Sequence, residues 1–127
     1  MRYDTHTLVH ICSSEEWTRA RAAGEYRPPS LAASGFVHLS APAQAHLPAN
    51  RLFGGRRDLI LLHIDTRRVA APIRWEPGVP GDPDDMLFPH LYGPLPVEAV
   101  TAVTDFRPGP DGTFAALADA DPAGPGC

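Results

Sequence analysis

Three histidines stand in short apolar segments of this 127-residue chain. His10 lies within Leu-Val-His-Ile, His38 within Gly-Phe-Val-His-Leu-Ser, and His90 within Phe-Pro-His-Leu-Tyr-Gly-Pro-Leu. An imidazole can transfer a proton near neutral pH or hydrogen-bond a ligand, and it needs a partner when it is buried. Any one of the three can be a purely structural histidine. Three in the same kind of context favour a shared pocket.

Several polar side chains near these segments could complete such a pocket. Glu76 ends the alternating segment Ile-Arg-Trp-Glu, where a carboxylate can orient a ribose hydroxyl or act as a base. Arg51 and Arg74 are candidates for binding an anionic group such as phosphate, although each also has an ordinary interpretation as a surface arginine. Tyr92 and Gly93 lie in a proline-bounded turn, where the ring could stack on a base.

The expected site residues divide by role. Ser40 could donate a hydrogen bond to a ligand but also suits a helix cap, and Asn50 forms a polar pair with Arg51 at an expected helix end. We expect catalysis from His38, His90 and Glu76, and ligand binding from His10, Ser40, Asn50, Arg51, Arg74, Tyr92 and Gly93.

The sequence also excludes several kinds of chemistry. All 11 basic residues are arginine, so Schiff-base and P-loop lysine chemistry are ruled out, and no nucleophile elbow or dinucleotide-binding glycine motif is present. His6 and His10 are four residues apart but lie in an expected strand, not a helix, so we expect no metal centre, although three strand histidines can converge in space. The net charge of −4 gives no reason to expect nucleic-acid binding.

The first elements can be placed from periodicity and caps. Residues 5–12 are rich in β-branched and apolar side chains and predict a strand that carries His10. Ser13, followed three residues later by Glu16, matches a capping box. A helix should therefore run from there to about residue 23, with Gly24 as its stop.

The rest of the chain is richer in strands than in helices. A second strand is expected at residues 36–39, followed by a helix that Ser40 caps and Pro48 interrupts or ends. The most hydrophobic run, residues 59–65, predicts a central strand buried on both faces. Two further strands are expected at residues 73–76 and 97–106, and the second is either a strand throughout or a strand entered from a turn.

This order predicts one α+β domain over residues 1–114, with two or three short N-terminal helices. Residues 115–127 are mostly Ala, Asp, Pro and Gly and predict a disordered tail. No stretch approaches ~20 consecutive apolar residues, and no signal-like run begins the chain, so we expect a soluble cytoplasmic protein with no membrane segment.

Two sequence blocks are specific enough to carry a family resemblance. They are the Gly-Phe-Val-His-Leu-Ser block at residues 35–40 and the Phe-Pro-His-Leu-Tyr-Gly-Pro-Leu block at residues 88–95. With Leu-Leu-His-Ile-Asp and Arg-Trp-Glu between them, residues 7–106 resemble the bacterial family catalogued as domain of unknown function 952. That family is similar in fold to the ADP-ribosyltransferase superfamily, so the resemblance implies split antiparallel sheets around an NAD-type cleft.

The resemblance also implies roles for individual residues. In that superfamily a histidine or arginine of the first strand holds the adenosine ribose, and His10 stands at the matching place. Residues 36–40 look like the strand that walls the nicotinamide pocket. The catalytic glutamate of the transferases opens a late strand, and by chain order that position falls nearer His90 than Glu76.

Three functional hypotheses follow. The leading one is a small enzyme whose histidine-lined cleft binds NAD or a related nucleotide, where NAD would be a substrate, and the sequence identifies no cofactor. An alternative is an acid–base enzyme on the same fold that acts on a small metabolite, for example in a biosynthetic pathway, through His38 and His90. A third is a non-catalytic binding module for a small ligand.

Overall fold

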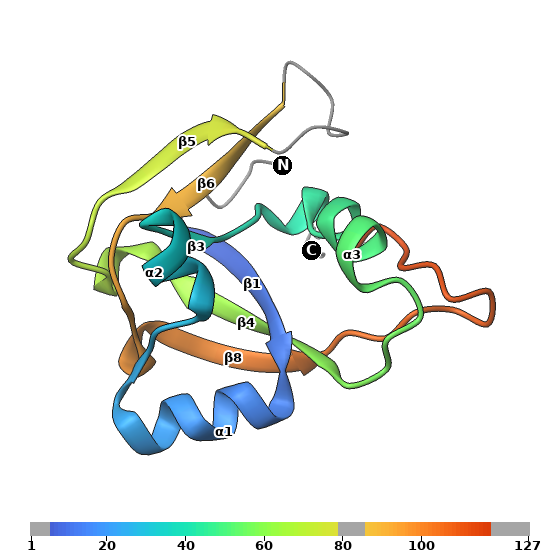
Figure 1. Ribbon diagram of the computed structural model, residues 1–127, viewed down its shortest axis with the longest axis horizontal. Coiled ribbons are helices and arrows are strands. Elements are labelled where there is room, and N and C mark those ends of the chain that lie inside the picture. Colours follow the sequence, from blue (N-terminus) through green and yellow to red (C-terminus); the bar gives the residue numbers. More distant parts are fainter. Residues whose placement is uncertain (1–5, 79–85, 118–127) are drawn as a thin grey trace, which may run out of the picture.

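The computed structural model describes residues 6–78 and 86–117. Short helices and antiparallel strands make up a mixed α+β domain (Figure 1), which confirms the expected class. The α-helices of the described residues all lie in the N-terminal half of the chain. Residues 118–127 of the predicted tail lie outside the described part, whereas Leu117 packs against a buried cluster.

A three-stranded antiparallel sheet of order β1-β4-β8 divides the interior. Its strands are β1 (Thr7–Ser13), β4 (Leu59–Asp65) and β8 (Val100–Asp105). The middle strand, β4, coincides with the central strand expected at residues 59–65. Side chains alternate across a strand, so Leu61 and Leu62 face opposite sides and each enters a different buried cluster.

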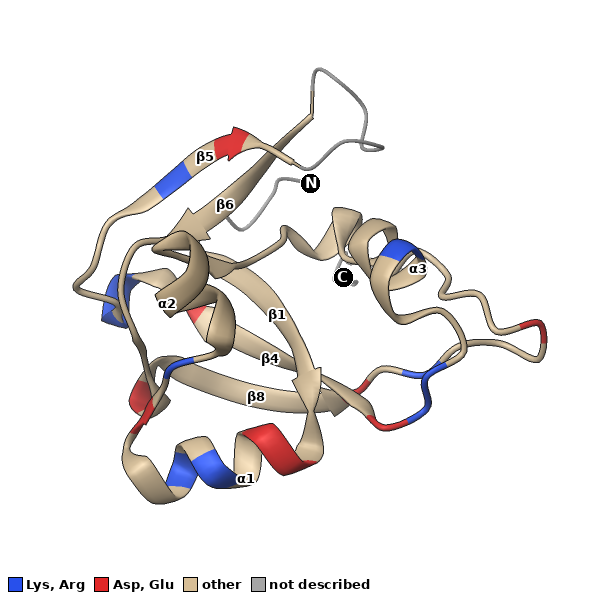
Figure 2. Cartoon of the chain, in the orientation of Figure 1, with Lys and Arg blue, Asp and Glu red and all other residues tan. Residues whose placement is uncertain are grey.

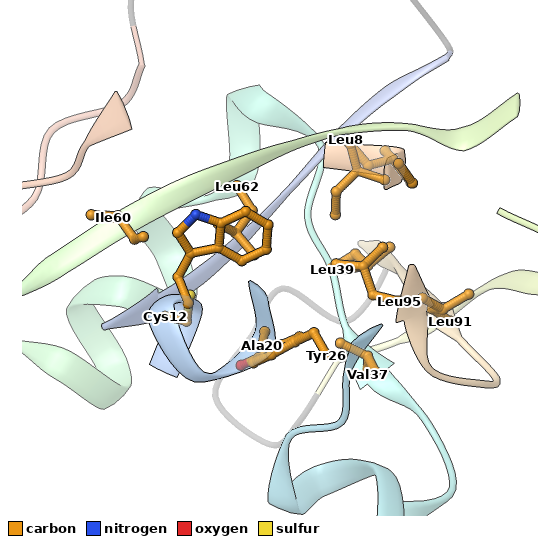
Figure 3. Close-up of a cluster of buried hydrophobic side chains, with 13 residues drawn as sticks. Leu8, Cys12, Ala20, Tyr26, Val37, Leu39, Ile60, Leu62, Leu91 and Leu95 are labelled. Atoms are coloured by element: carbon orange, nitrogen blue, oxygen red, sulfur yellow. The ribbon is translucent and has the colours of Figure 1, made fainter. Parts of the chain in front are cut away.

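The two clusters form the hydrophobic core. The first cluster (Figure 3) packs between the central sheet, the helix that follows β1 and the other strands, and it consists of Leu8, Cys12, Trp17, Ala20, Tyr26, Val37, Leu39, Ile60, Leu62, Ile64, Leu91, Leu95 and Ala99. The second cluster lies on the opposite face and consists of Val9, Ala45, Ala49, Leu59, Leu61, Phe106 and Phe114. Burial on both faces explains why residues 59–65 read as a continuous apolar run.

A second three-stranded sheet, of order β3-β6-β5, stands beside the first. It contains β3 (Val37–His38), β6 (Leu87–Leu91) and β5 (Ile73–Pro77), and the two-stranded pair β2 (Glu25–Tyr26) and β7 (Leu95–Pro96) completes the strands. The two larger sheets join where Val9 and Ser40 exchange backbone hydrogen bonds of 2.8 and 2.9 Å. This bridge places the end of β3 directly against β1.

The helices begin and end largely where local signals predict. The first helix, α1 (Ser14–Ala23), starts with a capping box between Ser13 and Glu16 and ends at Gly24, whose φ is 89°. The second, α2 (Pro29–Ser34), ends at Gly35, also with a φ of 89°. The third is α3 (His46–Phe53). A left-handed φ favours glycine, so both stops depend on the residue type.

Two sequence-based expectations about helix boundaries were wrong, and one open alternative is decided. Ser40 does not cap a helix: a 3₁₀ turn (Pro42–Gln44) follows Ala41, whose backbone N–H donates to the Gln44 side chain at 2.9 Å. Pro48 does not interrupt α3, because it lies in the first turn, where a backbone N–H has no helical acceptor anyway. The last strand begins at Val100 and is entered from a 3₁₀ turn at Val97–Ala99, which is the second of the two alternatives expected for this segment.

Candidate functional site

A cavity of about 540 Å³ opens between α3 and the strands β1, β3 and β6. Its volume lies in the range of small-molecule sites. Five of the predicted residues line it, namely His10, His38, Ser40, Arg51 and His90. Its walls are otherwise largely apolar and include Phe36, Leu39, Leu52, Phe53 and Phe88. The three histidines that the sequence places in apolar segments thus all line the same cavity.

Strand register brings the central residues into one row. His38 of β3 pairs with His90 of β6, and His90 pairs in turn with Arg74 of β5. The rings of His38 and His90 are 5.5 Å apart between centroids and nearly perpendicular, at 81°. Directly paired residues point to the same face of a sheet, so two imidazoles and a guanidinium project together.

Glu76 holds His90 in a defined orientation. One carboxylate oxygen, Oε1, accepts hydrogen bonds from His90 Nδ1 at 2.8 Å and from the Tyr92 hydroxyl at 2.6 Å. The Tyr92 hydrogen bond, followed by that from His90, holds the pKa of Glu76 below its ordinary value, so this carboxylate is ionised at neutral pH. Because Nδ1 carries the proton toward Glu76, Nε2 is the nitrogen of His90 that remains for chemistry.

Phe36 packs against both catalytic candidates and was not predicted from the sequence. Its ring stacks on His90 with centroids 4.0 Å apart and an interplanar angle of 13°, and it meets His38 edge-on at 4.8 Å. The ring of Tyr92 lies 5.3 Å from that of Phe36, and the Arg74 guanidinium lies 5.3 Å from the centre of the Tyr92 ring. Arg74 and Tyr92 therefore support the cavity wall, and neither lies among its lining residues.

His10 is buried, and both of its ring nitrogens are engaged. Nδ1 lies 2.5 Å from the backbone carbonyl oxygen of His38, and Nε2 lies 2.9 Å from the hydroxyl of Tyr26. Burial lowers the pKa of His10 to about 4, so the imidazole is neutral. A carbonyl can only accept, so Nδ1 donates and Nε2 accepts from Tyr26. Tyr26 was missed because its two-residue strand has no sequence pattern.

The charged groups around the cavity are mainly basic. Arg51 and Arg56 line it together with Glu16, whose carboxylate already accepts the backbone N–H of Ser13 at 2.8 Å. Burial, then the nearby His90 and Arg51, lower the pKa of His38, so His38 is neutral at pH 7. Arg56 is itself paired with Asp58, to which its guanidinium donates at 3.0 and 2.7 Å. Figure 2 shows basic positions on α3 and in the loop that follows it.

Two predicted ligand-binding residues have structural contacts instead. The Asn50 side chain donates to the carbonyl oxygen of Phe114 at 2.9 Å and accepts from the Phe114 backbone N–H at 2.7 Å, which ties α3 to the C-terminal segment. A Cβ atom on Gly93 would meet the Cβ of Ala71 at 2.6 Å, so this glycine permits close packing. Neither residue lines the cavity.

Residues 6–78 and 86–117 contain no group of three or more His, Cys, Asp or Glu side chains arranged to hold a metal ion. No helix in the described part of the chain is long and apolar enough to cross a membrane.

The fold and the cavity define a small α+β domain with paired imidazoles in a partly basic pocket. The chain belongs to the family described as Protein of unknown function (DUF952), whose model matches residues 11–103. This confirms the family resemblance found in the sequence. No curated protein matches the chain significantly.

Solved structures of one bacterial protein resemble the chain closely. The X-ray structure of protein CC0527 from Caulobacter crescentus is 34% identical, with a TM-score of 0.73, and the match covers 86% of this chain and 93% of that one. The solution NMR structure of CC0527 matches with a TM-score of 0.71 and covers 87% and 92% of the two chains. Neither name states an activity, so function has to be argued from the site.

Proposed function

We propose that the protein is a small enzyme that binds a nucleotide-like anion, such as ADP-ribose or NAD, and transfers protons through His38 and His90. The observation that supports this most is the difference between the two adjacent imidazoles. His90 has a carboxylate partner in Glu76, whereas His38 has none among the described contacts and lies near Arg51. Neighbouring titratable groups in different environments are typical of an acid and a base.

The environments of the two histidines support different roles for them. His38 is neutral at pH 7 because burial and nearby positive groups lower its pKa, so it is the general base. Glu76 stabilises the positive charge that His90 carries when it holds a second proton, so His90 is the general acid. A ligand hydroxyl would give its proton to His38 and a leaving group would receive one from His90 Nε2.

The cavity walls indicate what the ligand looks like. The Arg51 guanidinium lies at the cavity and suits an anionic part such as phosphate, whereas Arg56 is bonded to Asp58 at 3.0 and 2.7 Å and contributes charge to the wall more than a free donor pair. The rings of Phe36 and Phe53 line the same cavity and suit a planar base. These features fit a nucleotide better than a small aliphatic metabolite.

The proposed enzyme would share the split-sheet arrangement of the ADP-ribosyltransferases but would use a different catalytic residue type. Split antiparallel sheets beside a cavity are compatible with that likeness. Glu76 accepts hydrogen bonds from His90 and Tyr92 and does not line the cavity, so it acts through His90 and not on a ribose hydroxyl. We therefore propose histidine acid–base chemistry in place of a glutamate-centred transfer.

Ligand titration tests the binding half of this proposal. Millimolar ADP-ribose should raise the melting temperature of the wild-type protein, because a ligand at 100 times its Kd stabilises the folded state by about 2.7 kcal/mol. Arg51→Ala should abolish most of the increase, and Arg57→Ala, at an exposed position outside the cavity lining, should retain it. Absence of any shift with ADP-ribose or NAD would overturn the nucleotide assignment.

The pH dependence of turnover tests the catalytic half. With an active substrate, the rate should rise with pH through the pKa of His38, below the ordinary histidine value of 6.5, as the base loses its proton. His38→Ala should remove this limb of the profile while leaving ADP-ribose bound. A wild-type limb that persists in His38→Ala would assign the base to another residue.

A further inference from the structure

A buried chain of hydrogen bonds links one strand from each of the three sheets. The Tyr26 hydroxyl on β2 donates to Nε2 of His10 on β1, and Nδ1 of His10 donates to the carbonyl oxygen of His38 on β3. His10 is 8% exposed and Tyr26 6%. The rings of His10 and Tyr26 are 5.0 Å apart. Both ring nitrogens of His10 are thereby used within the protein.

The strand that receives this hydrogen bond is short. β3 has only two residues, Val37 and His38, and it pairs with β6 through those two positions. Beyond them it is anchored by Leu39, whose N–H donates to Pro89 at 3.0 Å, and by the bridge from Ser40 to Val9. Two residues of sheet pairing constrain an edge strand weakly. The position of His38 therefore depends on contacts outside its own sheet.

We infer that His10 and Tyr26 are positioning residues, which hold the backbone of His38 so that its imidazole stays against Phe36 and His90. This inference rests on the proposed role of His38 as the base. It assigns His10 no contact with a ribose, because the nitrogen that a ribose hydroxyl would need is already bonded to Tyr26. The hydrogen bond from the neutral His10 imidazole fixes the orientation of the His38 carbonyl group. Hydrogen-bond partners fix the orientation of metal-binding histidines in the same way.

Side-chain NMR measures this hold without any ligand. The His38 ring protons lie beside the rings of Phe36 and His90, at centroid distances of 4.8 and 5.5 Å, so their chemical shifts report the position of His38. His10→Leu removes both hydrogen bonds and should move the His38 resonances toward the values of a histidine with no aromatic neighbours. His10→Asn places an amide N–H near the position of Nδ1 and should keep them close to wild type.

A second variant covers the case in which His10→Leu does not fold. Tyr26→Phe keeps the ring and removes only the hydroxyl, so it should move the His38 resonances in the same direction by a smaller amount. Unchanged His38 resonances in folded His10→Leu, or in Tyr26→Phe if His10→Leu does not fold, would overturn the inference. So would a His10→Asn spectrum that matches His10→Leu.

Binding data separate this inference from the proposed function. ADP-ribose should bind His10→Leu roughly tenfold more weakly than wild type, the value of about one hydrogen bond, and His10→Asn nearly as well as wild type. If wild-type protein binds no ADP-ribose but His38 still moves in His10→Leu, the positioning role stands and the nucleotide assignment fails. If ADP-ribose binds and His38 does not move, the reverse holds.

Discussion

At the scale of single residues, burial decides which histidine can ionise. His10 is fully enclosed and bonded on both nitrogens, whereas His38 is exposed enough to meet a ligand. The two are joined through one hydrogen bond to a backbone carbonyl. The same residue type thus has two roles, and only the surroundings distinguish them.

The buried state of His10 predicts how stability changes with pH. Its folded-state pKa of about 4 lies below the ordinary 6.5, so between these values the unfolded chain binds a proton that the folded protein does not. The contribution of neutral His10 to the free energy of unfolding is therefore fully present above pH 6.5. It falls as the pH drops toward 4, by at most about 3 kcal/mol.

Urea unfolding between pH 7.5 and 4 measures this loss. His38 and His63 also have lowered pKa values and add to the wild-type slope with the same sign. The contribution of His10 is thus the difference between the wild-type slope and that of His10→Leu, which should be flatter. Parallel slopes for the two proteins would show that His10 is not buried in its neutral form.

The sequence indicated which histidines could line a pocket, but not which side chains contact them in the folded protein. His10, His38 and His90 were recognisable because each interrupts an apolar run. The contact of Glu76 with His90 depends on a strand register between residues 14 positions apart, and nothing local specifies it. Phe36 lies in the segment 36–40 that the family resemblance assigns to a pocket wall, but its stacking on His90 depends on the pairing of β3 with β6 and has no local signal.

At the scale of elements, signals within a few residues were sufficient for some boundaries. The capping box at Ser13 and the stop at Gly24 placed α1 correctly, because both act through neighbouring backbone groups. The two-residue strands β2 and β7 have no such local determinants and exist through their pairing with each other, whereas the apolar run around β3 was recognisable. Predicting β2 and β7 requires the tertiary fold.

Replacing Gly93 by alanine should cause overpacking against Ala71, and a second substitution at Ala71 should relieve it. Gly93→Ala would bring two Cβ atoms within 2.6 Å at Ala71, and overpacking of this kind costs about 1–3 kcal/mol. Ala71→Gly in the same protein removes the opposing atom and should recover most of the loss. Denaturant unfolding of the two single variants and the double variant measures the coupling.

A matched control keeps the Gly93 test specific. Gly54 has ordinary backbone geometry, with a φ of −48°, and an added Cβ would lie 3.5 Å from the nearest atom. Gly54→Ala should therefore change stability little. If Gly93→Ala is tolerated as well as Gly54→Ala, a close approach of Ala71 is not the reason for glycine at this position.

The contacts of Asn50 indicate that α3 holds the C-terminal segment around Phe114 in place. Its amide makes two hydrogen bonds to the backbone of Phe114, whose side chain is 1% exposed in the second cluster. Asn50→Ala should cost about 1–3 kcal/mol, because backbone groups lose their partners. Hydrogen exchange should accelerate at the Phe114 amide in this variant. Unchanged protection there, with Arg57→Ala as reference, would contradict the role of Asn50.

At the scale of the whole molecule, the central sheet lies between the two hydrophobic clusters and contributes side chains to both. Adjacent residues of β4 alternate between the clusters, so neither can lose its packing without disturbing the strand that the other needs. The second sheet, which carries the paired histidines, connects to this unit at the Val9–Ser40 bridge and at the His10 hydrogen bond. The cavity therefore depends on the fold as one cooperative unit.

This arrangement predicts a single unfolding transition even when one cluster is weakened. Leu61→Ala weakens only the second cluster and Leu62→Ala only the first, and each should cost about 2–5 kcal/mol because both side chains are almost completely buried. Trp17 belongs to the first cluster, so in a Trp75→Phe background its fluorescence reports that cluster alone, whereas far-UV circular dichroism reports the whole backbone. In Leu61→Ala the two signals should still change at the same urea concentration, shifted together from wild type. If circular dichroism of Leu61→Ala changes at a lower urea concentration than Trp17 fluorescence, the two faces of β4 unfold separately. The coupling through this strand would then be too weak to hold the cavity and both clusters together.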